Sequence, residues 1–206
     1  MYVNIFNQIF MKAISVIVII IFLCSSVFAQ QTALNNFNTE QQRIAKTGVY
    51  VIGSYAAANV IYGSIAAQNA TGSTKYFHEM NAIFNGVTLG ISALGIITAK
   101  KEGSLNYVSS LKKQHALEKL FLFNAGLDLA YIAGGAYLQE KAKTSPKNSL
   151  KQKGYGQSIM LQGGVLFLFD GIMYFINKKH GEKLYGLGER IQLTSTGNGI
   201  GVSVKL

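Results

Sequence analysis

Long apolar stretches with almost no charged residues dominate this chain. Residues 47–74 and 80–99 contain no charged residue, 120–139 contain only Asp128, and 154–177 contain only Asp170. A helix needs about 20 predominantly apolar residues to cross a bilayer, whereas a helix of a soluble bundle carries a polar stripe with a period of 3.6 residues. The pattern therefore favours membrane helices. The predicted spans are residues 47–67, 80–99, 120–139 and 157–177.

Polar segments between these stretches predict where the helices begin and end. Thr39 followed by Glu40 is typical of a helix N-cap, so the first helix is expected to run from Thr39 to about Ala67. Residues 69–74 are rich in Gly, Ser and Thr and predict a turn. The other helices are predicted at about 76–101, 111–143 and 150–183. The fold class is therefore all-α, a four-span transmembrane helical bundle, and residues 30–185 form this domain.

A different pattern follows Tyr185. Apolar residues alternate with other residues around the segment Ser195–Gly199, which is typical of a β-hairpin. The sequence thus predicts a short C-terminal β-hairpin tail over residues 186–206. An isolated hairpin is marginally stable in water, so this tail is expected to lean on the bundle, the membrane or a partner.

The N-terminal region resembles a secretory signal. Lys12 is followed by the uncharged apolar run 13–23 and then by small residues at Val27 and Ala29, which predicts a signal peptide over residues 1–29. Met11 is an alternative natural start, and an uncleaved first membrane helix is the alternative interpretation. Because the single cysteine, Cys24, lies in the segment to be removed, the mature chain is expected to have no thiol or disulfide chemistry.

Composition and charge indicate which kinds of partner this chain could bind. The 206-residue chain is 49% hydrophobic and only 14% charged, with a net charge of +10. Its lysines and arginines are spread along the edges of the spans, where they suit lipid phosphates better than nucleic acid. We expect a lipid bilayer as partner, a homo-oligomer or an unknown membrane partner in addition, no nucleic acid and no cofactor. The predicted location is the bacterial inner membrane, with an orientation on which the signal peptide and the positive-inside rule disagree.

A layer of polar residues is predicted inside the membrane. Counted from Glu118 and Lys178 at a shared membrane face, Asp128 and Asp170 lie about 15 and 12 Å deep. Residues expected at a similar depth or one turn away are Asn59, Asn85 and Asn124. These carboxyl groups could be interhelical hydrogen-bonding groups, satisfied by the three asparagines and by Tyr55, Tyr62 and Tyr131, or they could form a proton or cation site.

Small residues spaced four apart predict close helix contacts. They are Gly86 and Gly90 in the second helix, and Gly126, Ala130 and Gly134 in the third. Such residues let helix backbones approach where lipid supplies no hydrophobic drive for association. The pattern indicates packing and no activity.

Catalytic signals are weak. The chain lacks H-E-x-x-H, G-x-S-x-G and the phosphate-binding loop motif, so we predict no catalytic residues and no enzyme. His115 and His180 are weak metal-ligand candidates at one membrane face, which would make the protein a membrane metalloenzyme. The leading prediction is a non-enzymatic structural or accessory protein of the bacterial envelope. The alternative is a small proton- or ion-coupled transporter that uses Asp128 and Asp170.

Three segments resemble a bacterial family of uncharacterised membrane proteins that carry a domain of unknown function. They are Met80–Asn85, Phe121–Asp128, and Leu161–Gly164 together with Phe169 and Asp170. The likeness covers about Asn38 to Lys183. It implies a four-helix membrane domain behind a signal peptide, with no assigned activity.

Overall fold

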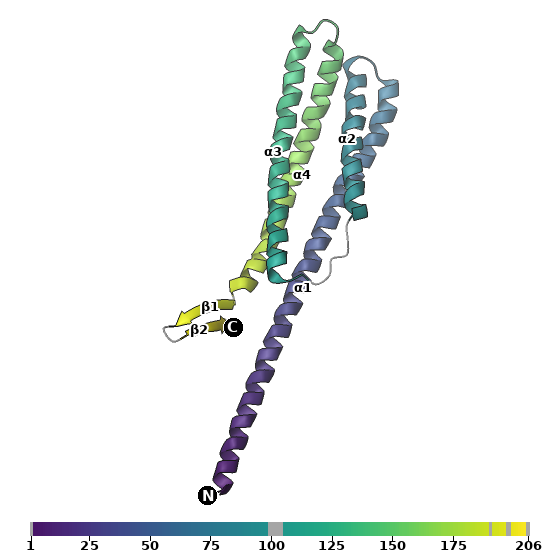
Figure 1. Cartoon of the computed structure of the whole chain (residues 1–206). Helices are drawn as coiled ribbons and strands as arrows, with labels where there is room; N and C mark the ends of the chain where they lie inside the picture. The colour runs from purple at the N-terminus through teal and green to yellow at the C-terminus, as the bar shows by residue number, and fades with distance from the viewer. Residues whose placement is uncertain (1, 99–104, 190, 197–198, 205–206) are drawn as a thin grey trace.

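The computed structural model contains four long helices (Figure 1). It describes residues 2–98, 105–189, 191–196 and 199–204, with side chains described over 31–98 and 105–187. The helices are α1 (Tyr2–Asn69), α2 (Gly72–Thr98), α3 (Tyr107–Thr144) and α4 (Ser149–Glu189). The predicted all-α class with four helices is confirmed.

The helices form two hairpins that meet along α2 and α4. Figure 1 shows α1 and α2 side by side, α3 and α4 side by side, and the first part of α1 projecting beyond the other helices. α2 packs along α4, whereas α1 contacts α4 over a shorter stretch. Among the described residues, no comparable packing joins α2 to α3. The helices therefore do not close into an evenly packed ring.

Three helix starts differ from those predicted. α2 begins at Gly72, four residues before the predicted start and inside the predicted turn 69–74. Thr39 does not cap α1, because the helix is continuous through it and its Oγ1 donates to the Asn35 carbonyl at 2.8 Å, as a threonine inside a helix does. α3 begins four residues earlier than predicted. Its cap is Asn106, whose side-chain oxygen accepts a hydrogen bond from the Ser109 backbone N–H at 2.9 Å.

α4 ends at Glu189, later than the predicted 183. Its last turns carry Leu184, which is fully buried against Leu34 and Phe37 of α1. Leu187 packs against the same cluster. Burial of these apolar side chains explains why the helix continues past Tyr185, the predicted end of the domain.

The described side chains place polar groups inside and apolar groups outside. Buried polar or charged side chains outnumber buried apolar ones thirteen to six, whereas large apolar side chains such as Ile97 and Phe175 are 78% and 68% exposed. A protein folded in water shows the opposite bias. All four helices are long and apolar enough to cross a membrane, over Gln31–Asn69, Gly72–Thr98, Tyr107–Thr144 and Ser149–Leu187.

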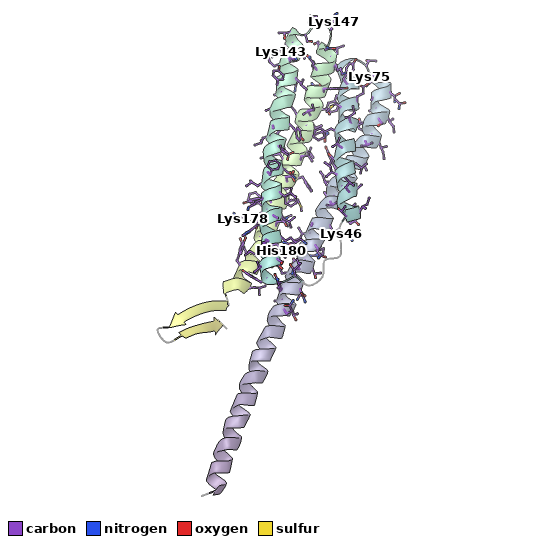
Figure 2. All side chains as sticks on the ribbon, in the orientation of Figure 1. Lys46, Lys75, Lys143, Lys147, Lys178 and His180 are labelled. Atoms are coloured by element: carbon purple, nitrogen blue, oxygen red, sulfur yellow. The ribbon has the colours of Figure 1, made fainter. Side chains whose placement is uncertain are left out.

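Lysines mark both ends of this apolar region. Figure 2 shows Lys75, Lys143 and Lys147 at one end of the helices and Lys46 and Lys178 at the other. Residues 120–139 of α3 lie between these two sets of lysines. As a helix they are about 30 Å long, which is the thickness of the hydrocarbon core of a bilayer. The lysines are therefore placed where lipid head groups would lie.

Glycines bring the helices together, although not at the predicted positions. A Cβ atom at Gly86, Gly90, Gly126 or Gly134 would meet nothing within 4 Å. A Cβ at Gly135, in contrast, would lie 2.6 Å from the Gly156 carbonyl oxygen. The contact on α3 is therefore made by Gly135 and not by the predicted Gly134. One residue corresponds to a rotation of about 100° around the helix axis.

Two short strands follow α4 in the backbone. β1 (Ile191–Thr196) and β2 (Gly199–Val204) pair antiparallel, with Ile191 opposite Val204. The side chains of residues 188–206 lie outside the described part of the structure. A folded hairpin tail that leans on other groups therefore stays a prediction.

Candidate functional site

Buried polar side chains gather in three places along the helices. We call them the amide network (Tyr55, Asn59, Asn81, Asn85 and Gln162), the carboxyl pair (Asp128 and Asp170) and the basal polar core (Gln41, Gln114, Asn177 and His180). The predicted single layer of five residues is therefore divided between two different groups.

The amide network ties α1, α2 and α4 together. Asn81 donates to the Asn59 side-chain oxygen at 3.0 Å, and its own side-chain oxygen accepts hydrogen bonds from Gln162 and from Asn85, the latter at 3.2 Å. The Tyr55 hydroxyl donates to the Gln162 side-chain oxygen at 2.9 Å. The Asn81 side-chain oxygen is thus the shared acceptor of the network.

The remaining donors of the network bond within their own helices. Asn59 Nδ2 donates to the Tyr55 carbonyl at 2.9 Å, and Asn85 Nδ2 donates to the Asn81 carbonyl at 2.8 Å. Asn81, Asn85 and Gln162 are at most 3% exposed. Such buried polar groups stabilise a membrane bundle only when they find partners, which these amides do.

This arrangement differs from the expected partners of the carboxyl groups. Asn59 and Asn85 bond to Asn81 and not to either aspartate. Tyr62 is 63% exposed with its ring edge-on to His78, and Tyr131 packs edge-on against Phe84. The partners Asn81 and Gln162 were missed, although both lie in charge-free stretches where any amide is expensive to leave unpaired.

The carboxyl pair lies on α3 and α4. Asp128 and Asp170 are 2% and 6% exposed, and their carboxyl groups are near enough to interact electrostatically. Asn124, one turn before Asp128, also lies near the Asp170 carboxyl group. Two buried carboxylates repel each other, which favours at least one proton on the pair.

The backbones of α3 and α4 approach closely beside Asp128. A Cβ at Gly163 of α4 would lie 2.9 Å from the Asp128 carbonyl oxygen. Asp170 follows Gly163 by seven residues, so its backbone lies about 10 Å further along the α4 axis than this contact.

A cavity of about 680 Å³ adjoins the carboxyl pair. All four helices contribute to its wall, which includes Asp128, Asp170 and Asn124 among mostly apolar side chains. Among the described residues, no lysine, arginine or histidine lines it. This volume falls within the range of about 300–1,000 Å³ that is typical of small-molecule sites.

The basal polar core joins α1, α3 and α4 near the Lys46 and Lys178 end. Gln41 donates to the Gln114 side-chain oxygen at 2.7 Å, and Gln114 donates to the Asn177 carbonyl at 2.6 Å and to Glu118 at 2.7 Å. Gln41, Gln114 and Asn177 are all fully buried. None of these three residues was predicted, because each lies at or beyond the end of a charge-free stretch.

The two candidate metal ligands bond to different partners. His180, near the Lys46 and Lys178 end of the helices (Figure 2), stacks on Phe37 with ring centroids 4.2 Å apart, and its Nε2 lies 3.0 Å from the Phe37 carbonyl oxygen. His115 Nε2 lies 3.1 Å from the Tyr185 hydroxyl. Over the described residues, no group of three or more His, Cys, Asp or Glu side chains could hold a metal ion.

His180 also faces a charged pair. Its Nδ1 lies 3.7 Å from the Glu40 carboxylate, which accepts a hydrogen bond from Lys183 at 2.8 Å. Since the Phe37 carbonyl can only accept, Nε2 must carry the hydrogen in that contact. The histidine therefore serves as a link between α4 and α1.

Comparisons with known proteins give one match. A model for a family of unknown function, DUF6992, matches residues 51–171, which contain the amide network and the carboxyl pair. No curated protein and no solved structure matches the chain. Because the matched region covers more than half of the sequence, the chain belongs to the DUF6992 family of unknown function.

Proposed function

We propose that this chain is an integral protein of the bacterial envelope with a non-enzymatic, structural or accessory role. The amide network carries this proposal. Its side chains use their hydrogen-bonding groups on one another across α1, α2 and α4, which holds the two hairpins in a fixed arrangement. Interhelical hydrogen bonds of this kind contribute on average about 0.6 kcal/mol each in a membrane bundle.

One observation favours a second candidate, a proton- or ion-coupled transporter. The carboxyl pair is buried, lines the cavity and has no basic residue beside it in that wall. Intramembrane carboxyl groups often mark ion pathways, because they are too costly to keep without a function. The two candidates make opposite predictions for the carboxyl pair.

Asparagine replacements separate these candidates. If the pair is structural, Asp128→Asn and Asp170→Asn should change the melting temperature in detergent little, and both variants should respond to pH and to added cations between pH 5 and 8 as the wild type does. This follows because an amide keeps the shape and most of the hydrogen-bonding capacity of a neutral carboxyl group. A wild-type melting temperature that moves with pH or cations, and stops moving in both asparagine variants, would contradict the structural role.

The proposed location is the bacterial inner membrane after cleavage of a signal peptide. The apolar run 13–23 and the small residues Val27 and Ala29 support cleavage before Gln30. The intact mass of protein purified from membranes should correspond to a chain that begins at Gln30. A mass that includes Met1 or Met11 as the first residue would contradict this proposal.

A further inference from the structure

The cavity has a mostly apolar wall with a polar place on α3 and α4. Ile91 and Val87 of α2 are representative of the apolar lining, and Asp128, Asp170 and Asn124 supply carboxyl and amide groups. Thr88, Ser92 and Tyr131 add hydroxyl groups elsewhere in the lining. A wall of this composition suits a ligand with an apolar body and one polar group.

The polar place has unused hydrogen-bonding capacity. The Oδ2 atom of Asp128 is buried and has no hydrogen-bond partner among the described residues, although the residue is only 2% exposed. Buried polar atoms are nearly always paired, so an unpaired carboxyl oxygen beside a cavity points to a donor supplied from outside the chain.

Charge indicates which donor fits. A carboxyl group is either neutral or negative, and no basic side chain among the described residues lines the cavity to balance a negative charge. A ligand with one positive charge would neutralise the pair, whereas an anion would be repelled. A neutral lipid chain would fill the apolar space and leave the charge unbalanced.

We propose that this cavity binds an apolar molecule that carries a single protonated amine, with the amine at Asp128 and Asp170 and the apolar body along α2. This binding site goes beyond the structural role proposed above and does not depend on it. The apolar body would reach the cavity from the bilayer, in which such a molecule dissolves.

Octylamine and octanol form a matched pair of probes, because they share an apolar chain and differ in charge. Native mass spectrometry of the full-length protein released from detergent at pH 7 would measure the affinity for each probe and the number of protein copies. We expect one octylamine per chain with at least a tenfold preference over octanol, which is typical of a hydrogen bond to a charged group.

Two kinds of variant test the site. Asp128→Asn and Asp170→Asn should each weaken the preference for octylamine, and the double variant should remove most of it, because two amides leave no carboxyl group to carry a negative charge. Glu140→Gln is the matched control, since this carboxylate is exposed and paired with Lys143 at the helix end, and it should leave the preference unchanged. Thr88→Phe, which places a large ring in the cavity wall, should weaken binding of both probes.

Several outcomes would overturn the proposal. Equal binding of octylamine and octanol would mean that the cavity is a lipid-filled gap. A preference that persists in the double asparagine variant would place the amine elsewhere. A dimer without bound octylamine in the native mass spectrum would mean that a second chain, and not an amine, covers the apolar wall of the cavity. Thr88→Phe keeps the test valid if an asparagine variant does not fold, because unchanged octylamine binding in it would also overturn the site.

Discussion

Replacing Gly135 with leucine is expected to separate α3 from α4 and to cause the largest loss of stability of any single change considered for this chain. A Cβ there would lie 2.6 Å from the Gly156 carbonyl oxygen and 2.9 Å from the Met160 backbone nitrogen. These are backbone atoms, so they can give way only if the helices move apart. Overpacking of this kind costs about 3 kcal/mol at the upper end of its usual range.

Gly134→Leu is the matched control, because the neighbouring glycine meets nothing within 4 Å. The same side chain added there enters open space on the surface, and it removes a glycine from a helix interior, which favours the helix by up to about 1 kcal/mol. Unfolding of both variants in detergent by increasing sodium dodecyl sulfate would compare them. Equal stability of the two variants would contradict the close contact of α3 and α4.

Gln114→Leu is expected to have the second largest effect. Leucine fills a similar volume but leaves the Gln41 amide without its partner in a fully buried place, whereas the Asn177 carbonyl keeps the hydrogen bond of its own helix. Leaving one such group unpaired costs about 1–3 kcal/mol, so a loss of about 2 kcal/mol is expected. The same unfolding measurement checks it.

Gln68→Leu provides the comparison for this change. Gln68 is exposed, and its Nε2 donates only to the Ser64 carbonyl of its own helix at 3.3 Å. Loss of this bond should change stability by no more than about 0.5 kcal/mol. If Gln114→Leu were as stable as Gln68→Leu, the basal polar core would not hold α1, α3 and α4 together.

The sequence predicted the number of helices for a simple physical reason. Charge-free stretches of about 20 residues report helix length. Depth was harder to predict: Asp128 and Asp170 were expected at nearly one level, whereas the contact of Gly163 with Asp128 places the Asp170 backbone about two turns further along α4.

Rotation about each helix axis could not be predicted in the same way. Asn59 and Asn85 were placed at the depth of the aspartates, but they face Asn81 on a different side of the assembly. Gly134 and Gly135 show the same problem, since only the second faces α4. A helix with apolar residues nearly all round has no polar face to indicate which side turns inward.

The basal polar core escaped prediction for a different reason. Gln41 and Gln114 lie in segments with charged neighbours, where a glutamine is ordinarily solvated. The extended helices of the structure continue past the apolar spans and bury these side chains against one another. The burial of Gln41 and Gln114 could therefore be seen only from the contacts between α1, α3 and α4 in the structure.

The central claim is that the exposed apolar side chains of these helices face lipid, and cysteine labelling tests it most directly. Leu168 is 65% exposed in the middle of α4, whereas Lys147 lies exposed in the turn between α3 and α4. In a Cys24→Ser background, broken membranes that expose both faces would be treated with a membrane-impermeant maleimide. Lys147→Cys should react quickly, and Leu168→Cys should react only after the protein is denatured in sodium dodecyl sulfate. Equally fast reaction at both positions would show that water and not lipid covers α4, which would contradict the account.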